Sequence, residues 1–179
     1  MKRFNVNIVG TAPVLLHSTA GMLAVAPAGV KTKPVTGLEE AERGAYRDAD
    51  GHLCLPTVAI GRALFQAASG IKVGKLTARA ALAGVFLDGE FVKLLGPDTG
   101  KPITDFEVDT RFVCVQRGRV PRSRAKVPAW AASLTFGYDE GLIDEQAIRE
   151  LLSRAGSIIG VGDYRPSTGG GPFGRFIVQ

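Results

Sequence analysis

Apolar and polar residues alternate strictly over residues 3–9 (RFNVNIV) and alternate again from Val108 (VDTRFVCVQ), and residues 131–138 (AASLTFGY) are a further predicted strand. A period of two is typical of half-buried strands. The segment TAPVLLHS after Gly10 continues extended, and GRFIV near the end of the chain predicts a last strand. The pattern therefore predicts a protein with several strands spread along its whole length.

Two stretches show helical periodicity instead. Residues 58–68 (VAIGRALFQAA) place apolar positions on one side, and Thr57 is the predicted N-cap. Gly61 is unfavourable inside this helix, which predicts close packing there. The second stripe runs from Ile143 to Ala155, with Asp144 as the predicted cap and Gly156 at the end.

Turn and loop signals connect these elements. Asp88-Gly89 between VFL and EFVKLL predicts a hairpin, and residues 18–45 lack periodicity and predict a long loop. The order is strand, helix, two or more strands, helix, strand. It predicts an α+β fold with a mostly antiparallel sheet, compatible with a ferredoxin-like or RNA-recognition-motif-like arrangement in a single domain over residues 1–179.

Composition adds a partner class. The 179 residues are 45% hydrophobic and 22% charged, which suits one globular domain, and the net charge of +5 favours a polyanion, with nucleic acid ahead of a membrane. Cys54 and Cys114 are predicted to be small buried side chains in a reducing compartment. There is no signal-peptide pattern and no long apolar run, so we expect a cytoplasmic protein with no membrane partner.

The segment 111–128 concentrates positive charge. Between Thr110 and Tyr138 there is no acidic residue, whereas six basic ones occur: Arg111, Arg117, Arg119, Arg122, Arg124 and Lys126. Two strands around this segment predict a protruding basic hairpin. Six cations without counter-charge would repel one another, which favours a bound polyanion over a solvated edge that only blocks aggregation.

A glycine-rich segment, 160–174, precedes the last strand. Glycine allows positive φ and close approach of another backbone, and arginine forks bind anionic oxygens. Together with Arg165 and Arg175 the segment predicts contact with an anionic chain, and Tyr164 is a candidate for base stacking. The alternative is an ordinary surface loop without a ligand.

Four segments, in this order, resemble the repeat-associated (RAMP) superfamily of CRISPR proteins, specifically the effector-backbone subunits that coat guide RNA. They are TAPVLLH, RDADGHLCLPTVAIGRALFQA, DTRFVCVQRGRVPRSRAKVPAWAASLTF and GGGPFGRFIV. They resemble the opening strand with its histidine, the turn and helix start, the thumb hairpin, and the final glycine-rich loop. Together they cover about two thirds of the chain. The sequence departs from the family where Thr57-Val58-Ala59-Ile60-Gly61-Arg62 replaces Ser-Ser-Leu-Lys.

The resemblance implies a non-catalytic subunit that binds single-stranded RNA in antiviral defence, repeats head to tail as a filament, and contacts other effector subunits. No Asp or Glu lies between His17 and Lys31, which argues against target cutting. The residues expected at the nucleic acid are His17, Lys31, Lys33, Arg47, Thr57, Arg62, Arg111, Arg117, Arg119, Arg122, Arg124, Lys126, Tyr164, Arg165, Gly169, Gly170, Gly171 and Arg175.

Two alternatives remain. The same scaffold could bind or anneal single-stranded DNA, since no single residue reports on the 2′-hydroxyl. It could also be a metal-free endoribonuclease with His17 or His52 as general base, although neither has a second proton-transfer partner at useful spacing. Phosphate-loop, dinucleotide and zinc motifs are missing, so no cofactor, metal or catalytic residue is predicted.

Overall fold

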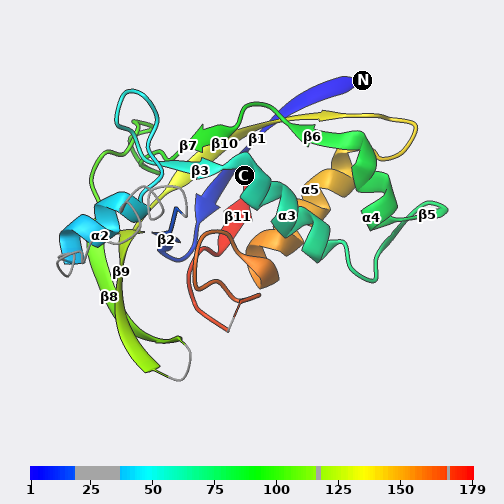
Figure 1. Cartoon of the computed structure of the whole chain (residues 1–179). Coiled ribbons are helices and arrows are strands. Elements are labelled where there is room, and N and C mark those ends of the chain that lie inside the picture. Colours follow the sequence, from blue (N-terminus) through cyan, green and yellow to red (C-terminus); the bar gives the residue numbers. More distant parts are fainter. Residues whose placement is uncertain (19–36, 116–117, 169) are drawn as a thin grey trace, which may run out of the picture.

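The computed structural model describes residues 1–18, 37–115, 118–168 and 170–179 (Figure 1). Lys31, Lys33, Arg117 and Gly169, which were expected at the nucleic acid, lie outside the described residues. The described part is a mixed α+β structure whose paired strands are all antiparallel. This confirms the predicted α+β class.

The main sheet has the strand order β11-β1-β10-β6 within the described residues. Its strands are β1 (Lys2–Gly10), β6 (Val85–Leu87), β10 (Ala131–Tyr138) and β11 (Phe176–Val178). Val6 of β1 pairs with Leu134 of β10, and both side chains are buried. The alternation in the sequence thus selects which face of each strand enters the core, and the three strands predicted within this sheet are confirmed.

Two helices, α3 (Thr57–Ala67) and α5 (Glu145–Arg154), pack beside each other on one face of this sheet (Figure 1). Their apolar stripes enter the core with the sheet. The Asp144 carboxylate accepts a hydrogen bond from Ala147 N at 2.8 Å, which confirms the predicted cap of α5.

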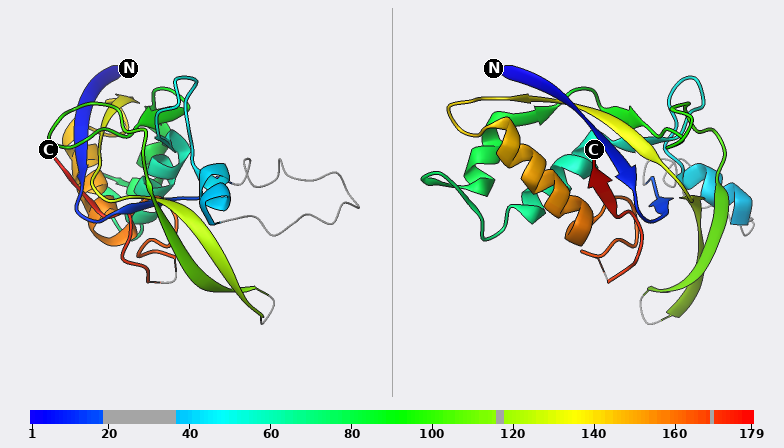
Figure 2. Two further views of the ribbon diagram at one scale, coloured as in Figure 1. Left: turned by 90° about the vertical axis from the view of Figure 1, so that its left-hand side faces the viewer. Right: turned by 180° about the vertical axis from the view of Figure 1, so that it is seen from behind.

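The second sheet has the order β2-β9-β8 and carries the projecting hairpin. It consists of β2 (Val14–Leu16), β8 (Glu107–Val115) and β9 (Gly118–Val127). Strands β8 and β9 extend away from the body (Figure 2), so a hairpin projects at the predicted segment 111–128. The strand that returns is the basic segment itself, β9, and not 131–138 as predicted, because 131–138 pairs with β1 in the main sheet. Helix α2 (Gly37–Gly44) packs on β9. The prediction of a loop throughout 18–45 is therefore wrong for 37–44. The helix is amphipathic and is stabilised by packing, which a local pattern of eight residues does not reveal.

The Asp88-Gly89 turn does not make a hairpin, contrary to prediction. Strand β6 pairs with β10, whereas β7 (Phe91–Lys93) pairs with β3 (Cys54–Pro56). The turn sends the chain from one sheet to another, because each flanking strand finds a partner distant in sequence. A further ribbon, β4 (Lys72–Val73) and β5 (Leu76–Thr77), leads into α4 (Ala78–Ala81) and the short helix η1 (Leu82–Gly84).

The start of α3 also differs from prediction. Pro56 occupies the N-cap, and its side chain makes no cap hydrogen bond. Thr57 is buried, and its hydroxyl donates to Gly89 O at 2.7 Å and to Glu90 O at 3.0 Å. Thr57 therefore ties α3 to the turn before β7, and the predicted cap is wrong.

The helix α5 continues into a π-helical turn, η2 (Ala155–Ile159). A Cβ on Gly156 would lie 2.1 Å from Phe176 O, so this glycine lets η2 pack against β11. The chain leaves the helix only at Gly160, with φ 73°. The prediction of Gly156 as the end of the helix is therefore wrong by one turn.

The core is closed at the chain reversal after β1 by Trp130. Its side chain is fully buried, and its indole Nε1 donates to Ala12 O at 2.9 Å. A Cβ on Gly10 would overlap the indole ring, so glycine is required at this crossing. Among the described residues, no helix is long and apolar enough to span a bilayer.

Candidate nucleic-acid interface

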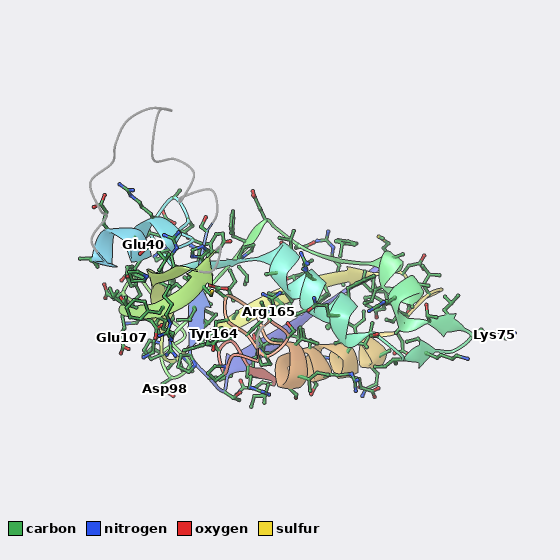
Figure 3. The ribbon with its side chains drawn as sticks, turned by 60° about the horizontal axis from the view of Figure 1, so that its bottom comes forward. Glu40, Lys75, Asp98, Glu107, Tyr164 and Arg165 are labelled. Carbon is green, nitrogen blue, oxygen red and sulfur yellow. The ribbon has the colours of Figure 1, made fainter. Side chains whose placement is uncertain are left out.

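A cavity of about 470 Å³ lies between the end of β2, the first turn of α3 and the glycine-rich segment 160–174. We call it the β2–α3 cavity. Its lining includes His17, Arg62 and Arg165, which the sequence analysis singled out from three separate segments. Figure 3 shows Tyr164 and Arg165 on the glycine-rich segment beside α3. The fold thus gathers three of the predicted residues in one concave site.

The two arginines of the cavity have no acidic partner within the described ranges. The Arg165 guanidinium donates to Gly162 O at 2.9 Å and to Ser167 Oγ at 3.0 Å, both within its own segment. Arg62 is exposed and has no hydrogen bond or ion pair in the described part of the chain. Their charge is therefore available to an anionic ligand.

The first turn of α3 supplies Pro56, Val58 and Ala59 to the same lining. This turn contains no acidic side chain and no side-chain cap. The first N–H groups of a helix lack intrahelical acceptors and carry the positive end of the helix dipole. In α3 the Thr57 N–H donates to Glu90 O at 2.9 Å, so the N–H groups of Val58 and Ala59 are the ones left for a ligand. Beside Arg62 and Arg165, they add to a positive potential that favours phosphate oxygens.

His17 follows β2 at the wall of the cavity. Its carbonyl accepts a hydrogen bond from the Tyr46 hydroxyl at 3.3 Å, and its Nδ1 is buried without a partner in the described structure. Burial raises the pKa of Tyr46, so its phenol stays protonated near neutral pH. The Tyr46 phenol beside His17 is therefore a donor and not a base.

Asp163 joins the cavity to the hairpin. Its Oδ2 accepts a charge-assisted hydrogen bond from Arg124 Nε, and the side chains are 30% and 11% exposed. Its Oδ1 accepts from Tyr164 N at 2.9 Å. Arg124 was expected to contact phosphate, but its guanidinium is buried against this carboxylate. The sequence analysis missed Asp163, although it is the one acidic residue of segment 160–174.

Other cations of the hairpin also have acidic partners, which corrects the expectation of an uncompensated basic arm. Glu40 on α2 and two residues at the base of β8 lie outside the acid-free window. The pairs are Arg111 with Asp109 (2.7 Å), Arg122 with Glu40 (3.1 Å) and Lys126 with Glu107 (2.8 Å). Arg119 is the described hairpin cation that has no ion pair in the structure. The free positive charge is thus near the tip of the hairpin and not along its length.

Aromatic contacts connect the hairpin with the glycine-rich segment. The Arg111 guanidinium lies 4.9 Å from the centroid of the Phe173 ring, and Tyr164 lies 6.1 Å from the same ring. Phe173 is buried. Tyr164 is 41% exposed and has φ 48°, a conformation rare for a non-glycine residue. Such strain is concentrated at functional sites, and here it presents an aromatic face to solvent.

The glycines of segment 160–174 are used differently from prediction. A Cβ on Gly171 would lie 1.7 Å from Tyr164 O, and one on Gly174 would lie 1.8 Å from Val161 O. The backbone that comes close is therefore the chain's own. Gly170 has φ 68° and open space around it, so of the predicted glycines with described structure it alone can admit another chain closely.

Three more predicted residues lie outside the cavity. Arg47 donates to both oxygens of the Glu42 carboxylate, to Gly51 O and to Thr104 O, so its guanidinium is occupied. Thr57 is buried, as described above. Arg175 donates to Ser157 O on η2. The donors of Arg47 and the hydroxyl of Thr57 are thus engaged within the protein in this structure.

A second group of titratable residues, Asp48, Asp50 and His52, has ligand atoms within 4.8 Å of one another. Asp48 accepts from the backbone N–H of Asp50 and of His52, so these residues form a turn. The Lys93 ammonium lies 3.0 Å from Asp48 Oδ2 and 3.6 Å from Asp50 Oδ2. It supplies the positive charge that the carboxylates require, so the group functions as an ion-pair network.

No protein-family model matches this sequence, and no curated protein matches it at a significant level.

Proposed function

We propose that this protein binds single-stranded nucleic acid, preferably RNA, through its sugar–phosphate backbone and without cleaving it. The observation that carries the proposal is the β2–α3 cavity, where Arg62 and Arg165, with no acidic partner in the described residues, meet the start of α3, which has no side-chain cap. A phosphate there would accept from guanidinium and backbone donors together. Contacts of this kind position a strand and carry no sequence information.

The strand would continue from the cavity toward the hairpin. Tyr164 offers an exposed ring next to Arg165, and Arg119 offers an unpaired cation nearer the hairpin tip. Stacking on a tyrosine contributes about 1–3 kcal/mol per base and tolerates any base. The interface then has one phosphate site in the cavity, one stacking site and one outlying cation.

We further propose that the main domain is ferredoxin-like and related to RAMP effector-backbone subunits. The succession β1, α3, β6, β10, α5, β11 with the strand order β11-β1-β10-β6 supports a split βαββαβ arrangement. The projecting β8–β9 hairpin before β10 corresponds to the position of the thumb in the resemblance. On this proposal the protein is cytoplasmic, coats guide RNA in a CRISPR-type defence complex, repeats head to tail and contacts other effector subunits.

The test is fluorescence anisotropy of labelled oligo(rU) and oligo(dT) over a range of salt concentrations. Phosphate-led binding requires affinity to fall with salt, with a slope of about −0.7 per phosphate neutralised on a single strand. The double variant Arg62→Ala, Arg165→Ala should weaken binding and flatten that slope. Lys126→Ala is the matched control, since its ammonium is already paired with Glu107. Binding that ignores salt, or a double variant that binds like the control, contradicts the proposal.

The two oligonucleotides also separate the alternatives. Equal or tighter binding of oligo(dT) would favour the DNA-binding alternative. Incubation of labelled RNA without metal tests the ribonuclease alternative, for which His17 is the only imidazole lining the cavity. Asp163 is engaged by Arg124, and the Tyr46 hydroxyl donates to the His17 carbonyl, so neither group is hydrogen-bonded to the His17 imidazole in the described structure. We expect intact RNA. Cleavage that is lost in His17→Ala would overturn this expectation.

A further inference from the structure

A second cavity, of about 260 Å³, lies between α3, α4 and β6. We call it the α3–β6 groove. Gly61, Leu64 and Phe65 form its α3 side, while Arg79 and Phe86 contribute from the opposite side. The groove is largely apolar, yet it contains a guanidinium. Nothing in the fold or in the proposed phosphate site requires an opening here.

Phe65 and Arg79 form a platform at this groove. Phe65 is 49% exposed, and the Arg79 guanidinium lies 4.9 Å from its ring centroid. Arg79 Nε also donates to Phe65 O at 3.3 Å, which fixes the guanidinium against the ring. An exposed aromatic ring with a cation beside it is the usual surface on which an unpaired nucleobase stacks.

Gly61 on α3 also indicates that the groove is kept open. Glycine inside a helix is unfavourable relative to alanine, and the sequence predicted close packing as its reason. The structure shows the contrary, since a Cβ on Gly61 would find a single atom, Leu87 Cδ1, at 4.0 Å. No described element approaches α3 closely enough at this position to require glycine. What glycine preserves is the open space of the groove beside Phe65.

The groove and the β2–α3 cavity both lie along α3. Val58, Arg62 and Phe65 are three or four residues apart and therefore lie on one face of the helix, and all three are exposed. Val58 and Arg62 line the β2–α3 cavity. Phe65 lines the α3–β6 groove, and so does Gly61, which precedes Arg62 in the chain. In Figure 3 the helix runs from the side of Arg165 toward the side of Lys75.

We infer that the α3–β6 groove binds a nucleobase of the same strand whose phosphate occupies the β2–α3 cavity. This inference rests on the proposed function and adds a binding site to it. The base stacks on Phe65 in the space that Gly61 leaves open, and Arg79 contacts its edge or the adjoining phosphate. Arg62, between the two cavities, holds the intervening backbone.

The experiment uses the full chain and labelled oligo(rU) of increasing length, from about 4 to about 16 nucleotides. Phe65→Ala should weaken binding roughly 5- to 100-fold, and only for strands long enough to reach from the cavity to the groove. Phe65→Trp should keep the affinity, because it keeps the stacking surface. Ile177→Ala is the control, since Ile177 is equally exposed at 49% but lies on β11.

Gly61→Leu is the sharper variant. It fills the groove and replaces a poor helix former, so the midpoint of thermal unfolding should rise or stay constant while long strands bind more weakly. A purely structural role of Gly61 would instead lower stability and affect all strand lengths alike. A 5-iodouridine in the strand should crosslink to Phe65 in the wild type and not in Gly61→Leu.

The outcomes separate the two proposals. One outcome is that the wild type binds strands while the double variant Arg62→Ala, Arg165→Ala binds them more weakly, as the proposed function requires. If Phe65→Ala and Gly61→Leu then bind strands of every length as the wild type does, the inference about the groove fails and the proposed function stands. If wild type binds no strand, the proposed function fails. If Phe65→Ala instead reduces self-association measured by light scattering without nucleic acid, the groove is an interface between copies, and the inference is overturned.

Discussion

Asp163 is the residue at which the hairpin, the glycine-rich segment and the cavity meet. One carboxylate oxygen bonds the buried Arg124 guanidinium, and the other accepts from Tyr164 N. An ion pair that is largely removed from water is costly to break from one side, because the remaining charge is left without compensation. The shape of the cavity therefore depends on a residue that contributes little of its own to binding.

We expect Asp163→Asn to lower the free energy of unfolding by about 3 kcal/mol, since Arg124 would stay buried opposite a neutral amide. Urea denaturation followed by circular dichroism measures this. Glu107→Gln is the comparison, because its pair with Lys126 is exposed and should contribute less than about 1 kcal/mol. Equal losses of unfolding free energy in the two variants would contradict the prediction, because the buried Arg124–Asp163 pair would then contribute no more than the exposed Lys126–Glu107 pair.

Gly170 and Gly174 form a matched pair of positions, with φ values of 68° and 70°. Asparagine tolerates this left-handed conformation, so the backbone alone does not distinguish them. A side chain on Gly174 would collide with Val161 O, whereas Gly170 has nothing within 4 Å. We expect Gly174→Asn to cost about 1–3 kcal/mol of unfolding free energy and Gly170→Asn a few tenths. Similar denaturation midpoints would contradict this.

The two cysteines differ in environment. Cys54 is buried, and its burial raises the pKa of the thiol, whereas Cys114 on β8 is exposed. The expectation that both are buried is correct for Cys54 and wrong for Cys114. We expect a thiol reagent to label one cysteine in the native protein and two in denaturant. Saturating oligonucleotide should slow labelling of Cys114, which pairs with Arg119 across the hairpin. Rapid labelling of Cys54 would contradict the structure.

At the scale of elements, the sequence predicts what depends on neighbours in the chain. The strand alternation of β1 and the Asp144 cap of α5 are local signals, and both are confirmed. Pairing partners are not local. The Asp88-Gly89 turn has the composition of a hairpin, but its two flanking strands pair with β10 and β3, which are contributed by distant segments.

The charge of the β8–β9 hairpin likewise depends on residues that are distant in sequence. Its acid-free sequence is real, yet Glu40 and Asp163 reach it from other elements. We therefore expect Arg119→Ala to reduce the salt slope of RNA binding by about one, and Lys126→Ala to change it little. Anisotropy titrations over a series of salt concentrations measure both. A larger change for Lys126→Ala would mean that its ion pair opens when the strand binds.

At the scale of the whole molecule, the network of Asp48, His52 and Lys93 ties β3 to β7 and the preceding turn. Desolvation opposes ionisation of Asp48, but hydrogen bonds from the His52 N–H and Lys93 outweigh it and hold the pKa of Asp48 below its usual range. A depressed folded pKa contributes stability that is complete above about pH 4, the unfolded value, and is lost as the pH falls toward the folded value.

We accordingly expect the free energy of unfolding to fall as the pH is lowered below about 4. In Lys93→Met the fall should be smaller, because one donor that depresses the pKa of Asp48 is gone. Denaturation at several acidic pH values tests this, with Lys101→Met as the control on an exposed lysine outside the network. An unchanged acid profile in Lys93→Met would show that other hydrogen bonds determine the ionisation of Asp48.

The candidate site was predictable only in part, for the same physical reason. Arg62 and Arg165 follow from a helix start and a glycine-rich composition, but their meeting in one cavity depends on the packing of β2, α3 and segment 160–174. Asp163 and Tyr46 gave no local signal of their roles. Arg47 and Thr57 have internal hydrogen-bond partners, which residue type does not reveal.

Trp130 has a practical consequence. It is the single tryptophan of the chain, and its buried indole sits on Gly10 and Ala12, away from the residues that line either cavity. Intrinsic emission excited at the indole band thus comes from one site in the interior. A red shift of this emission would report unfolding of the protein interior. Oligonucleotide that binds at the two cavities should leave the emission spectrum unchanged, so an unchanged spectrum would show that the protein stays folded during the binding titrations.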